Sequence, residues 1–525
     1  MSMARQNPKA TARRSVQDRP DATVNEEGGL AFAMQPKMEL YTRVATALVG
    51  EPKFYDATAQ GDDEIRRLIG VVAKEDPQFV LDLAVYARRE LYLRTIPLVL
   101  LVEACRYPET RTFVRSTVPK VVTRADQLTE LVATWKKAFG DIGNHAKAGM
   151  MSNALKRGLA DAFDNFGAYG FAKYDRDGEV KLRDVLRITH PKPKMPERAA
   201  LYKQVLERTL TPPYTWEVTI STKGSTKENW EAAIPNMGYM ALLRNLRNFI
   251  QKGVDLTPVL KVLTDPEAVR KSKQFPFRFF SAYREIQSVT QSAEVLDALE
   301  TAMRLSVVNV PRLAGTTFLS SDNSHSMDAN VSAKSSVSMK DVANVLQALS
   351  THICDKAITS VFAEDFAVVP TMKSGSLLQA VERYRATDVG MATNAFLAID
   401  YLTENGISVD RIVIFSDMQC YDSEVTSRFA SMYSSVGARG NSLAESYHRY
   451  VSKIGKTPYL YSIDLAGYGT AQFPEGGVCM LAGWSDRVLG FFDAYEKTKD
   501  PGVVFEAIRK AGERSYKKDA GTETE

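Results

Sequence analysis

Apolar residues recur at helical spacing over residues 38–305, with hardly any of the alternation that strands show. The segment 75–89 is typical, because Asp76 can cap a helix whose first position is Pro77. Helical segments of about 12–15 residues are joined by short links. This pattern predicts an all-α array of stacked helical pairs, although the sequence has no fixed repeat period.

Two later helices also carry recognisable start signals. Thr123 is followed three residues on by Asp126, and Ser225 is followed three residues on by Glu228, which is the spacing of an N-terminal capping box. Pro235 lacks a backbone amide proton and should break the second of these helices.

The pattern changes after Val310, where short β-rich runs begin to alternate with amphipathic helices. Four nearly continuous apolar runs predict strands, at 316–321, 358–363, 411–417 and 458–464. Ser338 is the predicted cap of the helix between the first two strands. Apolar strands separated by helices predict a parallel α/β sheet that is covered on both faces, and such sheets bind ligands at the carboxyl ends of their strands.

Length and composition agree with this division. At 525 residues the chain is too long for one hydrophobic core, and its 44% hydrophobic and 25% charged residues are typical of soluble globular proteins. It contains no run of about 18 uncharged apolar residues and no secretory signal, so we expect no contact with a membrane. We expect a disordered basic arm (1–25), a helical domain (26–308), an α/β domain (309–510) and a disordered tail (511–525).

Cysteine usage and charge narrow the function classes. The cysteines at 105, 354, 420 and 479 form no CxxC pair, which argues against disulfides and a zinc site and favours a reducing compartment such as the cytoplasm. Lys and Arg outnumber Asp and Glu by 46 to 37 up to residue 310, whereas the acidic residues lead by 26 to 21 beyond it. The basic first part suggests a polyanionic partner, although a solvated basic face would have the same composition.

Oxygen-bearing side chains gather where two predicted strands end. Asp322, Ser324 and Ser326 follow the first strand, and Asp417 ends the third. Thr393 lies in a loop before a helix, at a comparable place in the α/β pattern. Carboxylates, hydroxyls and waters are the ligands of a hard cation, so these residues predict a divalent-metal site, with Mg²⁺ the best match.

A cation with an open coordination position can also activate water for hydrolysis. Near this site only His325 and Asp328 offer a general base, and the sequence contains no HExxH motif, no GxSxG elbow and no GxxxxGK[ST] phosphate loop. We therefore expect no catalytic residues, and a metal that holds a ligand instead.

The combination of a strand-end DxSxS, a loop Thr and a second strand-end Asp resembles the metal-ion-dependent adhesion site of von Willebrand factor type A domains. The resemblance implies a doubly wound, Rossmann-like domain in which the five residues hold the metal. His325 departs from that family, which more often has a small residue there. Its imidazole would either crowd the metal or lie beside an incoming ligand. A domain of the same fold with an empty site is the alternative.

Basic and aromatic residues are interleaved in the helical part, above all in "RKSKQFPFRFFSAYREI". In this stretch the cations and rings that alternate are Lys271, Lys273 and Arg278 with Phe277, Phe279 and Tyr283. Cations capture phosphates, and exposed rings stack on unpaired bases. The same aromatics would equally suit a core, and the arginines would equally suit surface ion pairs.

Several segments, in this order, resemble the Ro autoantigen family with its TROVE (telomerase, Ro and vault) module. They are "NEEGGLAF", "LRTIPLVLLVEACR", "ALKRGLADAF", "AKYDRDGEVKLRDVLRITHPKPK", "MALLRNLRN", "FPFRFFSAYR" and "GGVCMLAGWSDRVLGFF". The resemblance covers roughly residues 25–505 and includes the type A domain that follows the helical part. It points to a bacterial or phage relative.

This resemblance implies HEAT-like helical repeats curled into a ring that the type A domain closes. It implies an RNA-binding ribonucleoprotein of non-coding RNA quality control or processing. A Y-like small RNA would bind the outer surface, and the single-stranded end of a misfolded or unprocessed RNA would enter the central hole. In bacterial relatives a Y-like RNA tethers the ring to an exoribonuclease, so such an enzyme is an expected partner.

The family's residues for the outer site carry over to Lys173, His190 and, across a loop of different length, Arg176. Charge in the same stretch adds Arg187, Lys192 and Lys194. For the central hole we expect Arg244, Arg247, Lys271 and Lys273.

Two other function classes compete with RNA binding. In a metal-dependent protein-interaction scaffold, the cation would hold an acidic residue of a partner and the helices would serve only as a frame. A metal-dependent nuclease would lose cleavage on Asp322→Ala.

Overall fold

The computed structural model describes most of the chain. The described ranges are 19–47, 58–140, 151–175, 177–211, 215–274, 276–287, 289–290, 292–306, 311–332, 335–370, 375–424, 441–474 and 476–516. Three expectations therefore fall wholly or partly outside them, namely the basic arm up to residue 18, the tail from residue 517 and the candidate Arg176.

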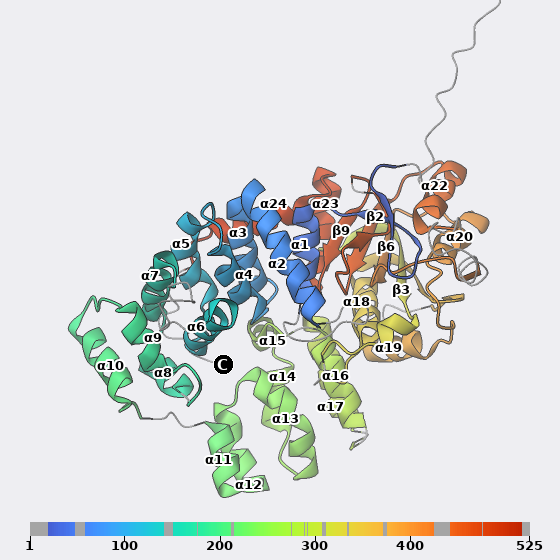
Figure 1. Ribbon diagram of the computed structural model, residues 1–525. Coiled ribbons are helices and arrows are strands. Elements are labelled where there is room, and N and C mark those ends of the chain that lie inside the picture. Colours follow the sequence, from blue (N-terminus) through green and yellow to red (C-terminus); the bar gives the residue numbers. More distant parts are fainter. Residues whose placement is uncertain are drawn as a thin grey trace, which may run out of the picture.

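Helices α1 to α17 follow one another through the first part of the chain, and Figure 1 shows them curving from the top centre around the left side to the bottom. Their bounds are α1 Pro36–Ala45, α2 Thr58–Glu75, α3 Pro77–Arg89, α4 Ile96–Ala104, α5 Arg111–Val121, α6 Asp126–Phe139, α7 Asn153–Ala162, α8 Ala168–Tyr174, α9 Leu182–Thr189, α10 Pro196–Glu207, α11 Trp216–Lys223, α12 Lys227–Ala233, α13 Tyr239–Gln251, α14 Thr257–Leu263, α15 Pro266–Ser272, α16 Pro276–Gln287 and α17 Ala293–Leu305. Single 3₁₀ turns, η2 Phe163–Asn165 and η3 Ile234–Asn236, separate some of them. This is the all-α array that the hydrophobic spacing predicts.

Local cap signals were partly right. The Asp76 side chain accepts the amide of Phe79 at 3.3 Å, as predicted. The prediction for Ser225 is wrong by one residue. Thr226 caps α12 instead, because the Ser225 hydroxyl accepts the indole proton of Trp230 at 2.9 Å.

The prediction for the start of α6 is also wrong. Its N-cap is Ala125 and not Thr123, whose amide and hydroxyl both bond to the side-chain oxygen of Gln127. A side chain one turn into the helix therefore satisfies the amide of Thr123, so this residue remains outside the helix.

The second part of the chain is an α/β domain around a six-stranded sheet in the order β5-β4-β3-β6-β7-β9. The strands are β3 Leu313–Asp322, β4 Cys354–Phe362, β5 Phe366–Val368, β6 Arg411–Ser416, β7 Tyr459–Asp464 and β9 Cys479–Ala482. Its helices and 3₁₀ turns are η4 His325–Asp328, α18 Met339–Ile353, α19 Leu377–Ala386, α20 Phe396–Glu404, α22 Leu443–Ile454, η5 Asp486–Gly490, α23 Phe491–Thr498 and α24 Val503–Glu513.

All neighbouring strands in this sheet are parallel except β4 and β5. Every residue of β6 is buried, which requires that both faces of the sheet are covered. The chain leaves β3 toward β4 on one side and later returns through β6 on the other. The carboxyl ends of β3 and β6 therefore form the switch point at which such sheets bind ligands.

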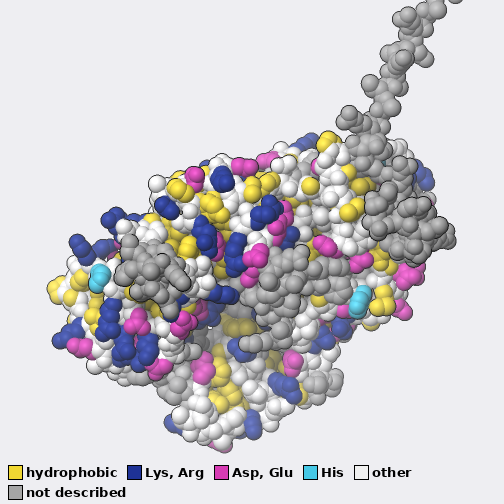
Figure 2. Space-filling view, in the orientation of Figure 1, with side chains coloured by type: hydrophobic (Ala, Val, Ile, Leu, Met, Phe, Trp, Pro, Cys, Tyr) yellow, Lys and Arg dark blue, Asp and Glu magenta, His cyan; other side chains and the backbone are white. Residues whose placement is uncertain are grey.

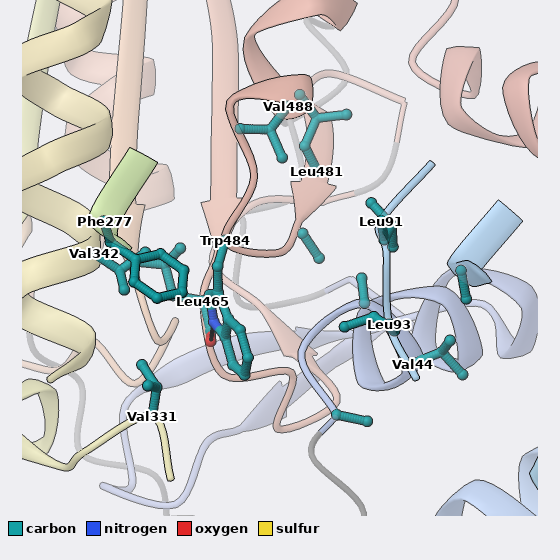
Figure 3. Close-up of a cluster of buried hydrophobic side chains, with 14 of the residues drawn as sticks. Val44, Leu91, Leu93, Phe277, Val331, Val342, Leu465, Leu481, Trp484 and Val488 are labelled. Atoms are coloured by element: carbon teal, nitrogen blue, oxygen red, sulfur yellow. Dashed lines mark hydrogen bonds between the residues drawn. The ribbon is translucent and has the colours of Figure 1, made fainter. Parts of the chain in front are cut away.

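Both ends of the helical array contact this α/β domain, so the array closes into a ring. At its beginning α1 packs against β9 and α3 packs against α24, while at its end α16 and α17 pack against α18 and α19. The junction is apolar, and Figure 3 shows Phe277 of α16 beside Val342 and Trp484 of the α/β domain. It also contains a buried charge, because Arg284 of α16 pairs with the enclosed carboxylate of Asp341 in α18 at 3.1 Å.

The predicted limits of the arm and the tail are wrong at their inner ends. Ala22–Val24 forms strand β1, which pairs with β2 (Leu30–Ala33), and β2 pairs with β8 (Thr470–Ala471) of the α/β domain. At the other end of the chain, α24 continues to Glu513 because it packs along α3. Residues 22–24 and the end of α24 are both ordered by contacts with distant parts of the chain, which a local sequence pattern does not predict. Among the described residues no helix is long and apolar enough to cross a membrane.

Candidate functional site

The predicted metal ligands come together at the switch point of the sheet. Asp322 is the last residue of β3 and Asp417 directly follows β6, the parallel neighbour of β3. The chain after Asp322 turns back, since its Oδ1 accepts the amide of Ser324 at 2.9 Å. This turn places the hydroxyls of Ser324 and Ser326 3.4 Å apart.

Backbone hydrogen bonds hold the loop of Thr393 against this turn. The amide of His325 donates to Met391 at 3.0 Å, and the amide of Tyr421 donates to the carbonyl of Thr393 at 3.1 Å. Thr393 itself is buried and lines the same cavity as Ser326. The structure therefore brings all five predicted ligands to one end of the sheet.

The two carboxylates of this site are buried and short of positive charge. Burial raises the pKa of Asp322 above its ordinary value, although Ser416 donates to its Oδ2 at 2.6 Å. Burial, followed by the nearby charge of Asp322, raises the pKa of Asp417 to about 8. The Oδ1 of Asp417 accepts the amide of Gln419 at 3.1 Å, whereas its buried Oδ2 has no hydrogen-bond partner among the described residues.

A hard cation fits this donor set. Two adjacent buried carboxylates, one with an unsatisfied oxygen, need a positive charge, and hydroxyls are natural further ligands for Mg²⁺. The described residues contain no cluster of three or more His, Cys, Asp or Glu side chains suited to a metal. Such a cation would therefore depend on Ser324, Ser326 and Thr393, or on waters, to complete its coordination.

A cavity of about 490 Å³ is lined by two of the predicted ligands, Ser326 and Thr393. Three acidic side chains line it, Glu27, Glu364 and Glu424, together with Tyr421. His325 also lines it and is 57% exposed, with its Nδ1 3.8 Å from Asp328. The imidazole thus lies at the cavity wall, where it can meet an incoming ligand.

The turn between β1 and β2 contacts the loop that follows Asp417, a feature that sequence reasoning missed. The side-chain amide of Asn25 donates to the carbonyl of Cys420 at 2.7 Å, and the amide of Glu26 donates to Gln419 at 2.9 Å. Only glycine fits at position 29, since a Cβ there would lie 2.2 Å from the carbonyl oxygen of Cys420. The Asn and Gly residues of "NEEGG" indicate a turn, but nothing in the sequence indicates which segment the turn contacts.

The candidates for the outer RNA site lie on and after α8 and α9. Lys173 of α8 is half-buried and lies 5.8 Å from the rings of Tyr169 and Tyr174. Arg187, Lys192 and His190 are exposed, and no ion pair of Arg187 or Lys192 is found among the described side chains. Figure 2 shows Lys and Arg side chains gathered over this part of the molecule.

Lys194 belongs to the same exposed surface but is already paired. Its Nζ lies 2.6 Å from Asp164, and this contact raises the pKa of the lysine. His190 adopts a left-handed backbone conformation (φ +47°) where α9 ends. This conformation turns the chain sharply into the loop that carries Lys192 and Lys194.

The candidates for the central hole differ in their side-chain partners. Arg244 and Arg247 are exposed on α13, and Arg247 pairs with Glu285 of α16 at 3.2 Å. Lys271 pairs with Glu267 within α15 at 3.3 Å. Lys273 lies elsewhere, over the ring of Tyr92 at 5.3 Å.

The rings of this region cannot stack on bases as folded. Phe277, Phe279 and Tyr283 are buried in the core, so the base-stacking interpretation of their stretch is wrong. Their helix α16 packs against α13 and α18, and its apolar face is needed for those contacts. Arg278 is the exposed exception, although partial burial of its guanidinium, followed by the charge of Arg244, lowers its pKa.

Comparison with known proteins decides the family. The family model described as "TROVE domain" matches residues 31–212 and 207–295, which together span half of the chain. The chain belongs to the TROVE family. TROVE proteins are RNA-binding ribonucleoproteins, so the coarse function that the sequence predicts is confirmed.

Two curated relatives carry the name telomerase protein component 1. The protein from Rattus norvegicus is 24% identical over 353 residues, which are 51% of this chain and 13% of the relative. The protein from Mus musculus is 24% identical over 338 residues, 49% of this chain and 13% of the relative. The TROVE chain thus spans only a small part of the length of these relatives.

The fold is similar to that in the crystal structure of the Deinococcus radiodurans RO (RSR) protein. The TM-score is 0.60 at 19% sequence identity, over 87% of this chain and 99% of that one. This match confirms the predicted fold class, a HEAT-like helical-repeat ring followed by a von Willebrand factor A-like α/β domain.

Proposed function

We propose that this TROVE protein binds Y-like small RNA on the surface of α8–α10 and takes single-stranded RNA ends into the centre of its ring. It would act in the quality control or processing of non-coding RNA, in the cytoplasm, with an exoribonuclease as partner. The observation that carries the proposal is the closure of a cationic helical array into a ring by a single α/β domain.

The outer surface suits the backbone of a folded RNA. Arg187 and Lys192 are exposed and are not engaged in ion pairs with described residues, so they can pair with phosphates. Lys194 would have to exchange Asp164 for a phosphate. Such contacts are largely independent of sequence and weaken steeply with salt.

The inner site selects by shape. Figure 2 shows the face hollowed near its centre, with Lys and Arg side chains along part of the rim. A ring of helices admits a single strand more readily than a duplex, so an RNA with a free unpaired end would be chosen. Arg244 is the strongest candidate for a phosphate contact, because no ion pair of this side chain is found among the described residues.

The test is the affinity for a stem-loop RNA with and without a single-stranded 3′ tail, measured over a salt series. Arg187→Glu/Lys192→Glu should weaken both RNAs at least tenfold, and each lost phosphate contact should lower the salt slope by about 1. Arg244→Glu/Arg247→Glu should weaken only the tailed RNA. Arg383→Glu, an exposed change on α19 of the α/β domain, is the matched control. Negligible binding of both RNAs by the wild type would overturn the proposal.

The metal site supports a second candidate function, capture of a partner protein. Asp322, Ser324, Ser326, Thr393 and Asp417 would hold Mg²⁺ or a similar cation. Such a bound cation offers an open coordination position to an oxygen ligand. The unsatisfied Oδ2 of Asp417 favours this candidate, and a pull-down with and without chelator tests it.

We propose no enzymatic activity for this site. Cleavage of RNA that Asp322→Ala abolishes would establish a nuclease in its place.

A further inference from the structure

A cavity of about 610 Å³ lies at the seam where both ends of the helical ring meet the α/β domain. Its walls come from the end of α3 and the loop after it, from the ends of α15 and α17, and from η5, α23 and α24. These segments are far apart in the chain and meet only when the ring is closed. We call this cavity the seam pocket.

One wall of the seam pocket is cationic. Arg487 and Arg514 both pair with the single carboxylate of Glu90, so two guanidinium groups share one negative charge. Lys273 and Lys510 add two more cations to the lining. In all, five Lys and Arg side chains against three Asp and Glu side chains line the pocket, which leaves an excess of positive charge.

Tyr92 also lines the pocket and contacts two of these cations. Arg487 donates to its hydroxyl at 2.6 Å and lies 5.4 Å from its ring centre, while the Nζ of Lys273 lies 5.3 Å from that centre. The backbone of Tyr92 is left-handed (φ +56°), a strained conformation for a non-glycine residue that is often found at ligand sites. The strained residue thus holds two cations in the lining of the pocket.

Another part of the lining is apolar. Phe491 and Ala494 of α23, Leu305 of α17 and Val503 of α24 line it. A pocket of about 300–1,000 Å³ with one apolar wall and a few converging charges is typical of small-molecule sites. Here the cations favour a phosphate group. A flat aromatic group would fit the apolar lining, where it can stack on the Phe491 ring or on an Arg guanidinium.

We propose that the seam pocket binds one nucleotide unit, with the phosphate on Lys273, Lys510 and Arg487 and the base against Phe491. The nucleotide is either a free mononucleotide or the terminal nucleotide of a strand, since both carry the same chemistry. Because the ligand touches both ends of the helical array and the α/β domain, its binding stabilises the closed ring. This site goes beyond the RNA surfaces proposed above, of whose candidate residues Lys273 alone lines it.

The test is calorimetric titration of the full chain with AMP, with inorganic phosphate and with adenosine. AMP should bind more tightly than inorganic phosphate or adenosine alone, and it should raise the midpoint of thermal unfolding of the chain. Lys510→Glu and Lys273→Glu should each weaken AMP at least tenfold. Lys497→Glu, an exposed change on α23 that does not line the pocket, should leave AMP binding unchanged.

Competition with an oligoadenylate identifies the source of the nucleotide. Displacement of AMP by the oligonucleotide supports the end of a strand as ligand, whereas AMP binding without displacement supports a free mononucleotide. Absence of AMP binding, or equal binding by wild type and both pocket variants, overturns the proposal. The untailed stem-loop RNA separates this result from the RNA proposal, because it offers no single-stranded end and Lys510→Glu should leave its affinity unchanged whichever source supplies the nucleotide.

Discussion

Gly512 of α24 lies where this helix crosses α3, and replacing it by alanine should loosen the closure of the ring. A Cβ at position 512 would lie 1.7 Å from Oδ1 and 2.2 Å from Cγ of Asp82 in α3, whereas ordinary contacts are 3.4 Å or longer. Asp82 is 8% exposed and has little room to turn aside. The two helices must therefore separate, or the carboxylate must leave its site.

The expected size of this effect follows from three contributions. Overpacking costs about 1–3 kcal/mol, and alanine returns about 1 kcal/mol because it favours a helix more than glycine does. A displaced α24 also loses the hydrogen bond from Lys120 of α5 to the carbonyl of Gly512, at a cost of about 1 kcal/mol. We expect Gly512→Ala to lower the free energy of unfolding by about 1–3 kcal/mol.

Urea unfolding of wild type, Gly512→Ala, Asp82→Ala and the double variant measures this contact. Removing the Asp82 side chain makes room for the methyl group, so the double variant should be more stable than the sum of the single changes by about 1 kcal/mol or more. Gly477→Ala is the control, because nothing lies within 4 Å of a Cβ at that position. A Gly512→Ala protein that is more stable than wild type, or strictly additive changes, would refute the close-contact argument.

Two further predictions concern buried carboxylates. Burial raises the pKa of Asp82 to about 6 from its ordinary 3.8, so the folded chain binds a proton in this window that the unfolded chain does not. Wild type should lose up to about 3 kcal/mol of stability as the pH rises from about 4 to 6. Asp82→Asn should not show that loss. If the free energy of unfolding changed equally with pH in both proteins, the prediction would be contradicted. At the metal site, Asp417→Asn should raise the thermal midpoint of metal-free protein above about pH 8, where Asp417 ionises against its burial and the charge of Asp322. It should also abolish the stabilisation by Mg²⁺, about 2.7 kcal/mol at a hundredfold excess over the Kd. Asp328→Asn, a change at an exposed neighbour, should retain that stabilisation.

Local signals predicted the elements well where one side chain decides the outcome. Asp76 caps α3 because its carboxylate reaches a backbone amide only three residues away. The same reasoning failed at Thr123 and Ser225, where another side chain, Arg88 or Trp230, already donates to the hydroxyl oxygen. Cap prediction therefore needs the partners of the cap residue as well as its type.

The sequence could predict that the candidate metal ligands lie together, because Asp322 and Asp417 are tied to strand ends. Once β3 and β6 are neighbours in a parallel sheet, Asp322 and Asp417 must meet at the same edge. The RNA candidates were less predictable. Exposure of Arg187 and Arg244, the ion pair of Lys194 and the burial of Phe279 all depend on which helix packs against which.

The sequence by itself determined the helical first part, the α/β second part and the chemistry at the strand ends, because these depend on spacings of a few residues. The tertiary structure alone decided the contacts that close the ring. Asn25 meets Cys420 across 395 positions, Arg487 meets Glu90 across 397, and the seam pocket exists only between such partners. Contacts of this kind follow from the fit of whole surfaces, and no local pattern of residues encodes which surface will be opposite.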